Sequence, residues 1–384
     1  MPTSIATTEA SGSAEDRAAR LSEATLAGER RALAQLLTAV ENSTPVAEAA
    51  MRRLYPLAGR AHLVGITGAP GSGKSTLVAA LTVEARTAGR SVAVIAVDPS
   101  SPITGVAILG DRVRMQVHAG DRDVFIRSMA ARGHAGGLAA TSVAAATVLD
   151  AAGFDLIFVE TVGTGQSEVE VAAAADTTVV LEAPEMGDEV QAIKAGLLEV
   201  ADIVVVNKGD RPGAHRTASQ LRAMLVASAP RDRADGRPRP KQPAVLITTA
   251  STGAGVPELL AALDRRRPAP SNVEPSSARA DDARTARARA QISAVLQERL
   301  AARLNDDTHV ARTRQTTDEV ANHRLDPYTA ADLLLTGLFA GSGSAADHHR
   351  PGIAGSRAVA AGEASPDHEV AAAPDPAVRP ESER

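Results

Sequence analysis

The segment GAPGSGKS, residues 68–75, has the composition and spacing of a phosphate-binding loop. It follows an apolar run at residues 62–67 and precedes a helical pattern that begins at Ser75, as this motif requires. Glycines let backbone N–H groups turn onto phosphate oxygens, and the helix N-terminus adds a positive dipole end. The alternative is a glycine-rich turn without a ligand. We assign these residues to the nucleotide: Gly68, Ala69, Pro70, Gly71, Ser72, Gly73, Lys74, Ser75 and Thr76.

Two side chains of this loop have predicted chemical roles. The Lys74 ammonium is expected to reach the β- and γ-phosphates of a nucleoside triphosphate and to act in catalysis. The Ser75 hydroxyl is expected to ligate Mg²⁺. The loop alone therefore predicts a nucleotide-binding protein.

A second motif, NKGD at residues 207–210, follows the apolar run of residues 203–206. Ligands of open α/β sheets bind at such strand ends, so we expect Asn207, Lys208 and Asp210 to bind the base. The Asp210 carboxylate can accept hydrogen bonds from N1–H and the 2-amino group of guanine. Adenine offers neither donor, and leaving a buried polar group unpaired gives rejection on the order of 10⁴-fold. The two motifs together predict GTP as the ligand.

A Ser/Thr-containing turn follows the apolar run of residues 244–248. We expect its residues Thr249, Ala250 and Ser251 to close the other side of the base. The alternative is an ordinary turn in which these hydroxyls bond to the local backbone.

Carboxylates at two further strand ends are candidate Mg²⁺ ligands, directly or through water. Asp98 ends the apolar run of residues 91–97, and Glu160 ends that of residues 155–159. Asp111, in the long connection after Asp98, is a third candidate. The alternative for each is a helix-capping carboxylate. Glu160 is also a catalytic candidate, as is Gly163, whose backbone N–H can sense the γ-phosphate and move on hydrolysis.

The residue that orients the hydrolytic water is not identified by its position. Thr164 stands where some GTPases carry glutamine after the switch glycine. Gln166 is a candidate, although a polar side chain on the surface is the simpler interpretation. Arg112 or Arg114 could act as an internal arginine finger, although a solvated position is the simpler interpretation for them too. We therefore predict slow intrinsic GTP hydrolysis that a partner protein raises.

Five long segments resemble the MeaB/ArgK family of GTPases, the accessory proteins of adenosylcobalamin-dependent acyl-CoA mutases such as methylmalonyl-CoA mutase. They are VGITGAPGSGKSTL (64–77), VDPSSPITGVAILGDRVRM (97–115), FIRSMAARGHAGGLA (125–139), VETVGTGQSE (159–168) and MGDEVQAIKAGLLEVADIVVVNKGD (186–210). The resemblance extends from about residue 26 to about residue 336.

This resemblance implies an α/β GTPase core with helical extensions at both ends, and a homodimer. It implies that Lys74, Ser75, Asp98, Asp111 and Glu160 serve the phosphates and Mg²⁺. Residues 185–196 would form a third switch that reports the bound nucleotide to the mutase. The implied function is that of a chaperone that gates adenosylcobalamin loading and protects or reactivates the mutase, while the mutase itself binds the cobalamin.

The sequence departs from the family pattern at Ile103 and Val106 in the first switch and at residues 182–186. These departures affect partner choice rather than GTP binding, and the sequence does not name the mutase. The main alternative is a nickel-type metal-insertion GTPase, which a His-rich or Cys-containing segment near the loop would favour. No such segment is present there. A scaffold with structural nucleotide and a small-molecule kinase are further alternatives.

Composition narrows the remaining classes. The chain of 384 residues is 44% hydrophobic but only 2% aromatic, so its core must consist of Ala, Val, Leu and Ile. A net charge of −5 argues against general nucleic-acid binding. The absence of cysteine excludes disulfides and thiolate metal sites. The polar start of the chain does not resemble a signal peptide, and no apolar run has the length of a membrane span; we expect a cytoplasmic protein without a membrane partner.

Strand and helix patterns alternate from residue 59 to residue 270, which predicts a doubly wound, mostly parallel sheet for the GTPase domain. Residues 1–20 are expected to be disordered, and residues 21–58 to form a helical arm broken near residues 43–45. A helical extension for dimerisation is expected at residues 271–340, and a disordered tail at residues 341–384. The Arg- and Pro-rich segment of residues 229–243 reads as an exposed loop.

Overall fold

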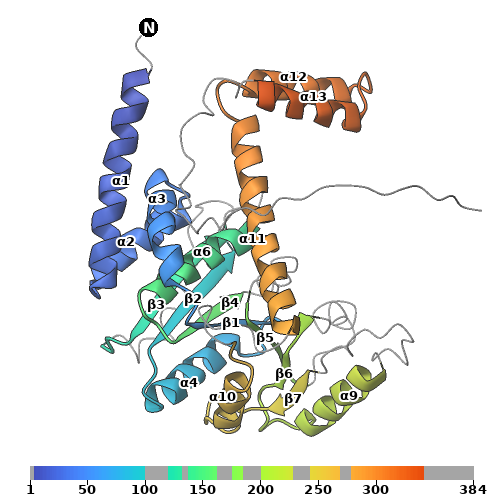
Figure 1. Cartoon of the computed structure of the whole chain (residues 1–384). Helices are drawn as coiled ribbons and strands as arrows, with labels where there is room; N and C mark the ends of the chain where they lie inside the picture. The colour runs from blue at the N-terminus through green and yellow to red at the C-terminus, as the bar shows by residue number, and fades with distance from the viewer. Residues whose placement is uncertain are drawn as a thin grey trace, which may run out of the picture. The chain divides into compact units, whose positions relative to one another are not determined.

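The computed structural model describes residues 4–99, 120–131, 137–161, 175–184, 200–227, 243–268 and 278–340. The chain forms two compact units, Met1–Arg314 and Gln315–Arg384. The first unit contains a parallel sheet and the helices that cover it (Figure 1).

The sheet has seven strands in the order β3-β2-β4-β1-β5-β6-β7, and every pairing is parallel. The predicted α/β fold with a doubly wound sheet is therefore confirmed. Most strand residues are buried, which explains the continuous apolar runs in the sequence. The strands are β1 (His62–Gly68), β2 (Val92–Pro99), β3 (Val124–Ala131), β4 (Leu156–Thr161), β5 (Thr177–Glu182), β6 (Ile203–Val206) and β7 (Ala244–Ile247).

Helices cover both faces of this sheet, because successive side chains of a strand point to opposite faces. In β5, Val179 and Leu181 pack in the core formed with α4 (Lys74–Thr87) and α10 (Val256–Asp264). Val180 instead packs in the core formed with α9 (Ala214–Ala227). The helix α6 (Gly137–Ala151) covers the neighbouring strands on the α9 face, so it lies opposite α4 (Figure 1).

An N-terminal arm packs over α6 and the strands β2 to β4. It contains α2 (Arg30–Glu41), α3 (Pro45–Leu54) and a short 3₁₀ turn (Tyr55–Leu57). Its helices bury Leu33, Leu36, Leu37, Val40 and Leu54 in that core. The predicted break falls between α2 and α3, where Ser43 has a left-handed φ of +47° and Thr44 caps α3 by accepting a hydrogen bond from the Ala47 N–H.

The structure differs from our expectation at the start of the chain, where α1 spans Ser4–Leu26 instead of a disordered segment. Among the side chains of α1 that the structure describes, those of Ala18, Ser22 and Thr25 are buried, and they have the spacing of one helix face. These side chains are small or polar, so a hydropathy pattern does not reveal the face. Through these small residues, α1 packs closely against α2 and α3.

The Asp150 carboxylate, near the end of α6, fixes the segment that connects the arm to β1. It accepts hydrogen bonds from the backbone N–H groups of Gly59, Arg60 and Ala61, at 2.5, 3.1 and 3.0 Å. Three charge-assisted hydrogen bonds to one carboxylate make this a firm attachment between the connecting segment and α6.

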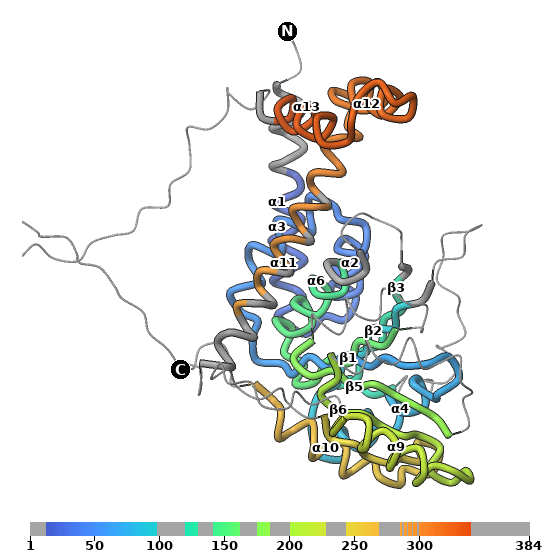
Figure 2. Tube along the Cα trace, turned by 90° about the vertical axis from the view of Figure 1, so that its right-hand side faces the viewer, coloured from blue at the N-terminus to red at the C-terminus, as the bar shows by residue number. Residues whose placement is uncertain are grey.

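The C-terminal part of the described chain is helical. It contains α11 (Ala278–Leu304), α12 (Val310–Ala321) and α13 (Pro327–Ala340). Asp306 precedes α12 and accepts from the His309 N–H, and Asp326 precedes α13 and accepts from the Thr329 N–H, so each carboxylate caps a helix. In the second unit, α13 lies beside the part of α12 after Gln315 in both views (Figure 1, Figure 2). Within the described ranges, no helix combines the length and the apolar composition needed to cross a membrane.

The amino ends of the strands contain a buried histidine whose titration affects stability. His62 is 1% exposed, and its Nε2 lies 2.8 Å from the Thr177 hydroxyl. Burial, and then the charge of Arg267, lower the pKa of His62 from 6.5 to about 4. The folded protein therefore keeps this imidazole neutral in a pH range where the unfolded chain protonates it.

We predict that the free energy of unfolding falls as the pH decreases from 6.5 to 4, by up to about 3 kcal/mol from this group alone. Above pH 6.5 both states are neutral and the contribution is constant. Urea unfolding at a series of pH values should show a smaller decrease for His62→Gln, whereas the exposed His215→Gln should behave as the wild type. An unchanged pH dependence in His62→Gln would contradict this assignment.

Candidate nucleotide-binding site

The predicted phosphate loop connects β1 to α4 at the carboxyl edge of the sheet. Gly68 has φ +136°, and a Cβ there would come within 2.1 Å of the Leu181 carbonyl oxygen on the neighbouring strand β5. Gly73 is left-handed with φ +96° and directly precedes α4. The conformation of the loop itself therefore requires glycine at these two positions, independently of any ligand.

Lys74 begins α4 and folds back over this loop. Its ammonium group donates hydrogen bonds to the carbonyl oxygens of Gly68 and Ala69, at 2.8 and 3.2 Å, and its side chain is buried. The positive charge therefore lies at the loop to which we assign the phosphates.

Ser75 of α4 and Glu160 of β4 are in direct contact. Glu160 lies at the carboxyl end of β4 in register with Ile66 of β1, and both side chains are buried. The Ser75 hydroxyl donates to Glu160 Oε1 at 2.6 Å. A hydroxyl and a carboxylate are oxygen donors of the kind that Mg²⁺ prefers, so the residues present fit the predicted metal.

The other predicted metal and switch residues are only partly described. Asp98 is the next-to-last residue of β2, and the preceding Val97 pairs with Thr161 of β4. The side chain of Asp98 lies outside the described residues. Asp111 and Gly163 lie outside them entirely. The same is true of the third switch predicted at residues 185–196.

Asn207 connects the phosphate loop to both loops predicted for the base. Its amide nitrogen donates to the Ser72 carbonyl at 2.9 Å. Its amide oxygen accepts from the Thr248 hydroxyl and from the Ala250 N–H, each at 3.1 Å. The buried amide has one orientation that satisfies all three partners, so it fixes three loops at once.

The rest of NKGD is held against the same loops. Lys208 has a left-handed φ of +58°, and its ammonium donates to the Gly71 carbonyl at 2.6 Å. The Gly209 N–H donates to the Thr248 carbonyl at 2.9 Å. A Cβ at Gly209 would come within 2.7 Å of the Ile247 side chain, so this position requires glycine. Asp210 is exposed and open to a ligand.

The structure thus brings Lys74, Ser75, Glu160 and Asn207 to one loop. Thr249 and Ala250 are nearly buried beside Asn207, and Ser251 is exposed. Sequence reasoning missed Thr248, whose hydroxyl orients the Asn207 amide. A polar residue at the end of an apolar strand was the available signal, but the identity of its partner depends on the sheet order.

The fold and the loop define the protein as a P-loop nucleotide-binding protein of the GTPase class. Residues 33–309 match the family model described as "Methylmalonyl Co-A mutase-associated GTPase MeaB". The chain belongs to this MeaB family, as its sequence segments predicted, and its enzyme class is GTPase.

Individual relatives agree with this assignment. A Pyrococcus horikoshii protein provisionally named as a GTPase is 46% identical over 308 residues, which is 80% of this chain and 94% of that protein. GTPase ArgK of Escherichia coli is 45% identical over 50% of this chain and 61% of its own length. The crystal structure of an LAO/AO transport system kinase has a TM-score of 0.58 and 28% identity, and covers 84% of this chain and 97% of that one.

We predict that Gly73→Ala destabilises the nucleotide-free protein more than Gly71→Ala does. Both glycines have positive φ, so each variant carries backbone strain of about 1 kcal/mol or more. Only at Gly73 would the new Cβ also meet the Asn207 amide, at 2.5 Å, whereas Gly71 has open space. Urea unfolding should show an extra loss of about 1–3 kcal/mol for Gly73→Ala; equal losses would show that the Asn207 contact does not constrain the loop.

Proposed function

We propose that this protein is a G-protein chaperone of an adenosylcobalamin-dependent acyl-CoA mutase, methylmalonyl-CoA mutase or a relative. The observation that carries the proposal is the family match over residues 33–309, whose description names that association. A Caenorhabditis elegans relative, "Methylmalonic aciduria type A homolog, mitochondrial", is 36% identical over 50% of this chain and 52% of its own length. In this proposal the protein gates cofactor loading and protects or reactivates the mutase, which itself binds the cobalamin.

The proposed GTP site uses the residues around the phosphate loop. Backbone N–H groups of residues 68–76 would bind the phosphates, and the Lys74 ammonium would exchange its loop carbonyl partners for phosphate oxygens. Asp210 would read guanine. Asn207 and Lys208 would hold the base loops in place through the contacts described above, and Thr249, Ala250 and Ser251 would close the other side of the base.

Mg²⁺ would be held by Ser75 and Glu160, with Asp98 and Asp111 as further proposed ligands. When bound, the ion neutralises charge on the β- and γ-phosphates. The buried contact between the Ser75 hydroxyl and Glu160 places both oxygens on the α4 side of β4. Glu160, Lys74 and the Gly163 N–H are the proposed catalytic groups.

Slow intrinsic hydrolysis and stimulation by the mutase complete the proposal. The support is the sequence after Glu160, which has Thr164 in the position that some GTPases use for a water-orienting glutamine. A partner that orders the switch segments would then raise turnover. The alternative is a metal-insertion GTPase, which a His-rich or Cys-containing segment beside the phosphate loop would favour; the sequence has no such segment there.

The test is GTP hydrolysis by the purified protein, alone and with a panel of adenosylcobalamin-dependent acyl-CoA mutases. We expect slow hydrolysis alone and a strong increase with one mutase. Asp210→Asn is the matched control, because the amide should shift preference from GTP to xanthosine triphosphate while leaving the loop intact. Binding of GTP without stimulation by any mutase would contradict the chaperone role, and unchanged GTP affinity in Asp210→Asn would contradict the base site.

We also propose a homodimer formed through the C-terminal helices. The support is an apolar stripe on α11, where Ile292, Leu296 and Leu300 share one helix face and are 61%, 61% and 39% exposed. An apolar stripe of this kind is a typical oligomer contact.

For this dimer, sedimentation equilibrium should show a dimer for the wild type and a monomer for Ile292→Glu/Leu296→Glu. The monomer fold should persist because both positions are exposed within the chain. Val226→Glu, at another exposed apolar position, is the control and should remain dimeric. A wild type that is monomeric at micromolar concentration would contradict the proposal.

A further inference from the structure

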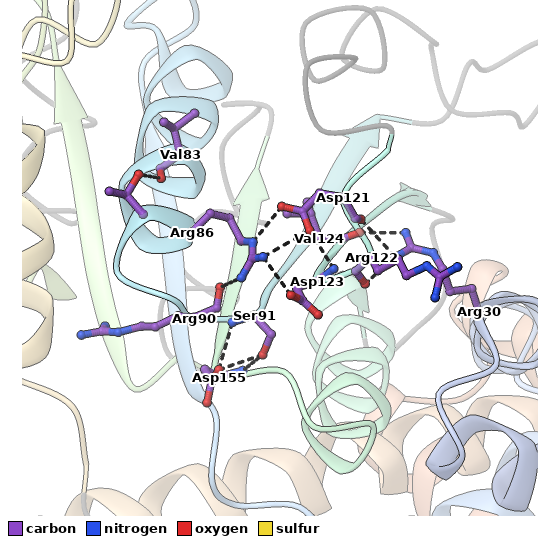
Figure 3. A network of polar contacts seen from close by, with 11 residues as sticks. Arg30, Val83, Arg86, Arg90, Ser91, Asp121, Arg122, Asp123, Val124 and Asp155 are labelled. Carbon is purple, nitrogen blue, oxygen red and sulfur yellow. Dashed lines mark hydrogen bonds and ion pairs between the residues drawn. The ribbon is translucent and has the colours of Figure 1, made fainter.

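The turn that leads into β3 is held from two sides by arginines of different elements. Residues 120–123 precede β3, and Figure 3 shows Arg86 and Arg30 approaching this turn from opposite sides. Arg86 belongs to the last turn of α4, the helix that begins with Lys74 and Ser75. Arg30 is the first residue of α2 in the N-terminal arm.

Arg86 binds the side chains of the turn. Its Nε donates to Asp121 Oδ2 at 2.8 Å and its Nη2 to Asp121 Oδ1 at 3.3 Å, which is a bidentate pair. The same Nη2 donates to Asp123 Oδ2 at 2.8 Å. Its Nη1 donates to the Arg90 carbonyl at 2.8 Å, so one guanidinium joins the end of α4, the following turn and the start of β3. The side chains of Arg86 and Asp121 are partly buried, so this geometry is better fixed than that of a fully exposed pair.

Arg30 binds the backbone of the same turn. Its Nη1 donates to the Arg122 carbonyl at 2.8 Å and, more weakly, to the Asp121 carbonyl at 3.4 Å. Its Nη2 donates to the Val124 carbonyl at 2.7 Å, and its guanidinium lies 5.3 Å from the centre of the Phe125 ring. The two arginines therefore bind different atoms of the turn: Arg86 binds its carboxylates, and Arg30 binds its backbone carbonyls.

Helix α4 can carry the effect of this turn to the nucleotide. Its 14 residues form a rigid rod of about 21 Å. Lys74 and Ser75 lie at one end of the rod and Arg86 at the other. Phosphate binding depends on the exact placement of the first end, and small displacements of binding groups have large effects. Fixing the second end limits how far the rod can tilt.

We propose that Arg86 and Arg30 are positioning residues for nucleotide binding, which act through the turn at residues 121–124 and make the N-terminal arm part of the nucleotide-binding unit. This inference rests on the proposed binding of phosphates at residues 68–76. By thermodynamic reciprocity, the nucleotide must in turn stabilise the docking of α2 by the same factor.

A second arginine contact of the arm provides a matched control. Arg127 of β3 donates from Nη2 to the Thr38 hydroxyl at 3.1 Å and to Glu41 Oε2 at 2.6 Å, near the end of α2. This contact joins the same helix to the same strand as Arg30 does. The hydrogen bonds of Arg127 described here do not include α4, so its loss should weaken arm docking without releasing the turn from Arg86.

The test measures the affinity of the full chain for GDP with Mg²⁺, by titration with a fluorescent GDP analogue, in Arg30→Gln, Arg86→Gln, Arg127→Gln and the Arg30→Gln/Arg86→Gln double variant. We expect Arg30→Gln and Arg86→Gln each to weaken binding about fivefold. The double variant should lose less than the product of the two, because both act through one turn. Arg127→Gln should weaken binding less than Arg30→Gln does, because Arg30 and Arg86 still hold the turn. In steady-state GTP hydrolysis, Arg30→Gln and Arg86→Gln should each raise the KM and leave kcat unchanged.

Two further measurements separate positioning from loss of folding. Arg86→Lys keeps the charge but makes one contact instead of a bidentate pair, so its affinity should lie between those of Arg86→Gln and the wild type. Hydrogen exchange in α2 should slow when GDP binds to the wild type, and this response should be absent in Arg86→Gln. Wild-type affinity in Arg30→Gln, or an equal loss in Arg127→Gln, would overturn the inference. A wild type that binds no GDP would instead overturn the nucleotide site itself.

Discussion

The side-chain amide of Asn207 is the contact on which the nucleotide site depends. It lies after β6, donates to the loop after β1 and accepts from two groups after β7. The loops that we propose to bind guanine are thus joined to the phosphate loop by one buried group in the ligand-free protein. A carboxylate at this position could not donate to the Ser72 carbonyl, and an apolar side chain would leave three polar groups unpaired. The same contact explains why Gly73 must lack a Cβ.

Because all strands are parallel, their carboxyl ends meet at one edge of the sheet and their amino ends at the other, and the two edges have different contacts. The carboxyl ends place Lys74, Glu160 and Asn207 together around the phosphate loop. The amino ends are held by ion pairs: Arg90 pairs with Asp264, the last residue of α10, and Arg266 pairs with Asp202 before β6. These pairs are partly exposed, so each stabilises the fold modestly. Their consequence is that they attach α10 and the amino ends of the strands at the edge opposite the candidate nucleotide site.

Short sequence patterns predicted those features that depend only on neighbouring residues of the chain. Apolar runs located β1, β2, β4, β6 and β7, and the loop and NKGD motifs identified the class of ligand. The orientation of the Asn207 amide was not predictable, because its partners come from two other loops, one after β1 and one after β7. The contacts of Arg30 were not predictable either, since its acceptors are backbone carbonyls more than 90 positions away. Residues of α1 were misjudged because small side chains form its buried face.

The position of Arg30 has a consequence for the edge of the sheet. β3 is an edge strand, and the Asp123 carbonyl before it accepts from Val92 of the neighbouring β2. The next carbonyl, that of Val124, points the opposite way and is taken by Arg30. An open edge invites pairing with strands of other molecules. The arm therefore also shields the start of β3, and a chain that lost its arm would expose both an apolar face and an unpaired edge to aggregation.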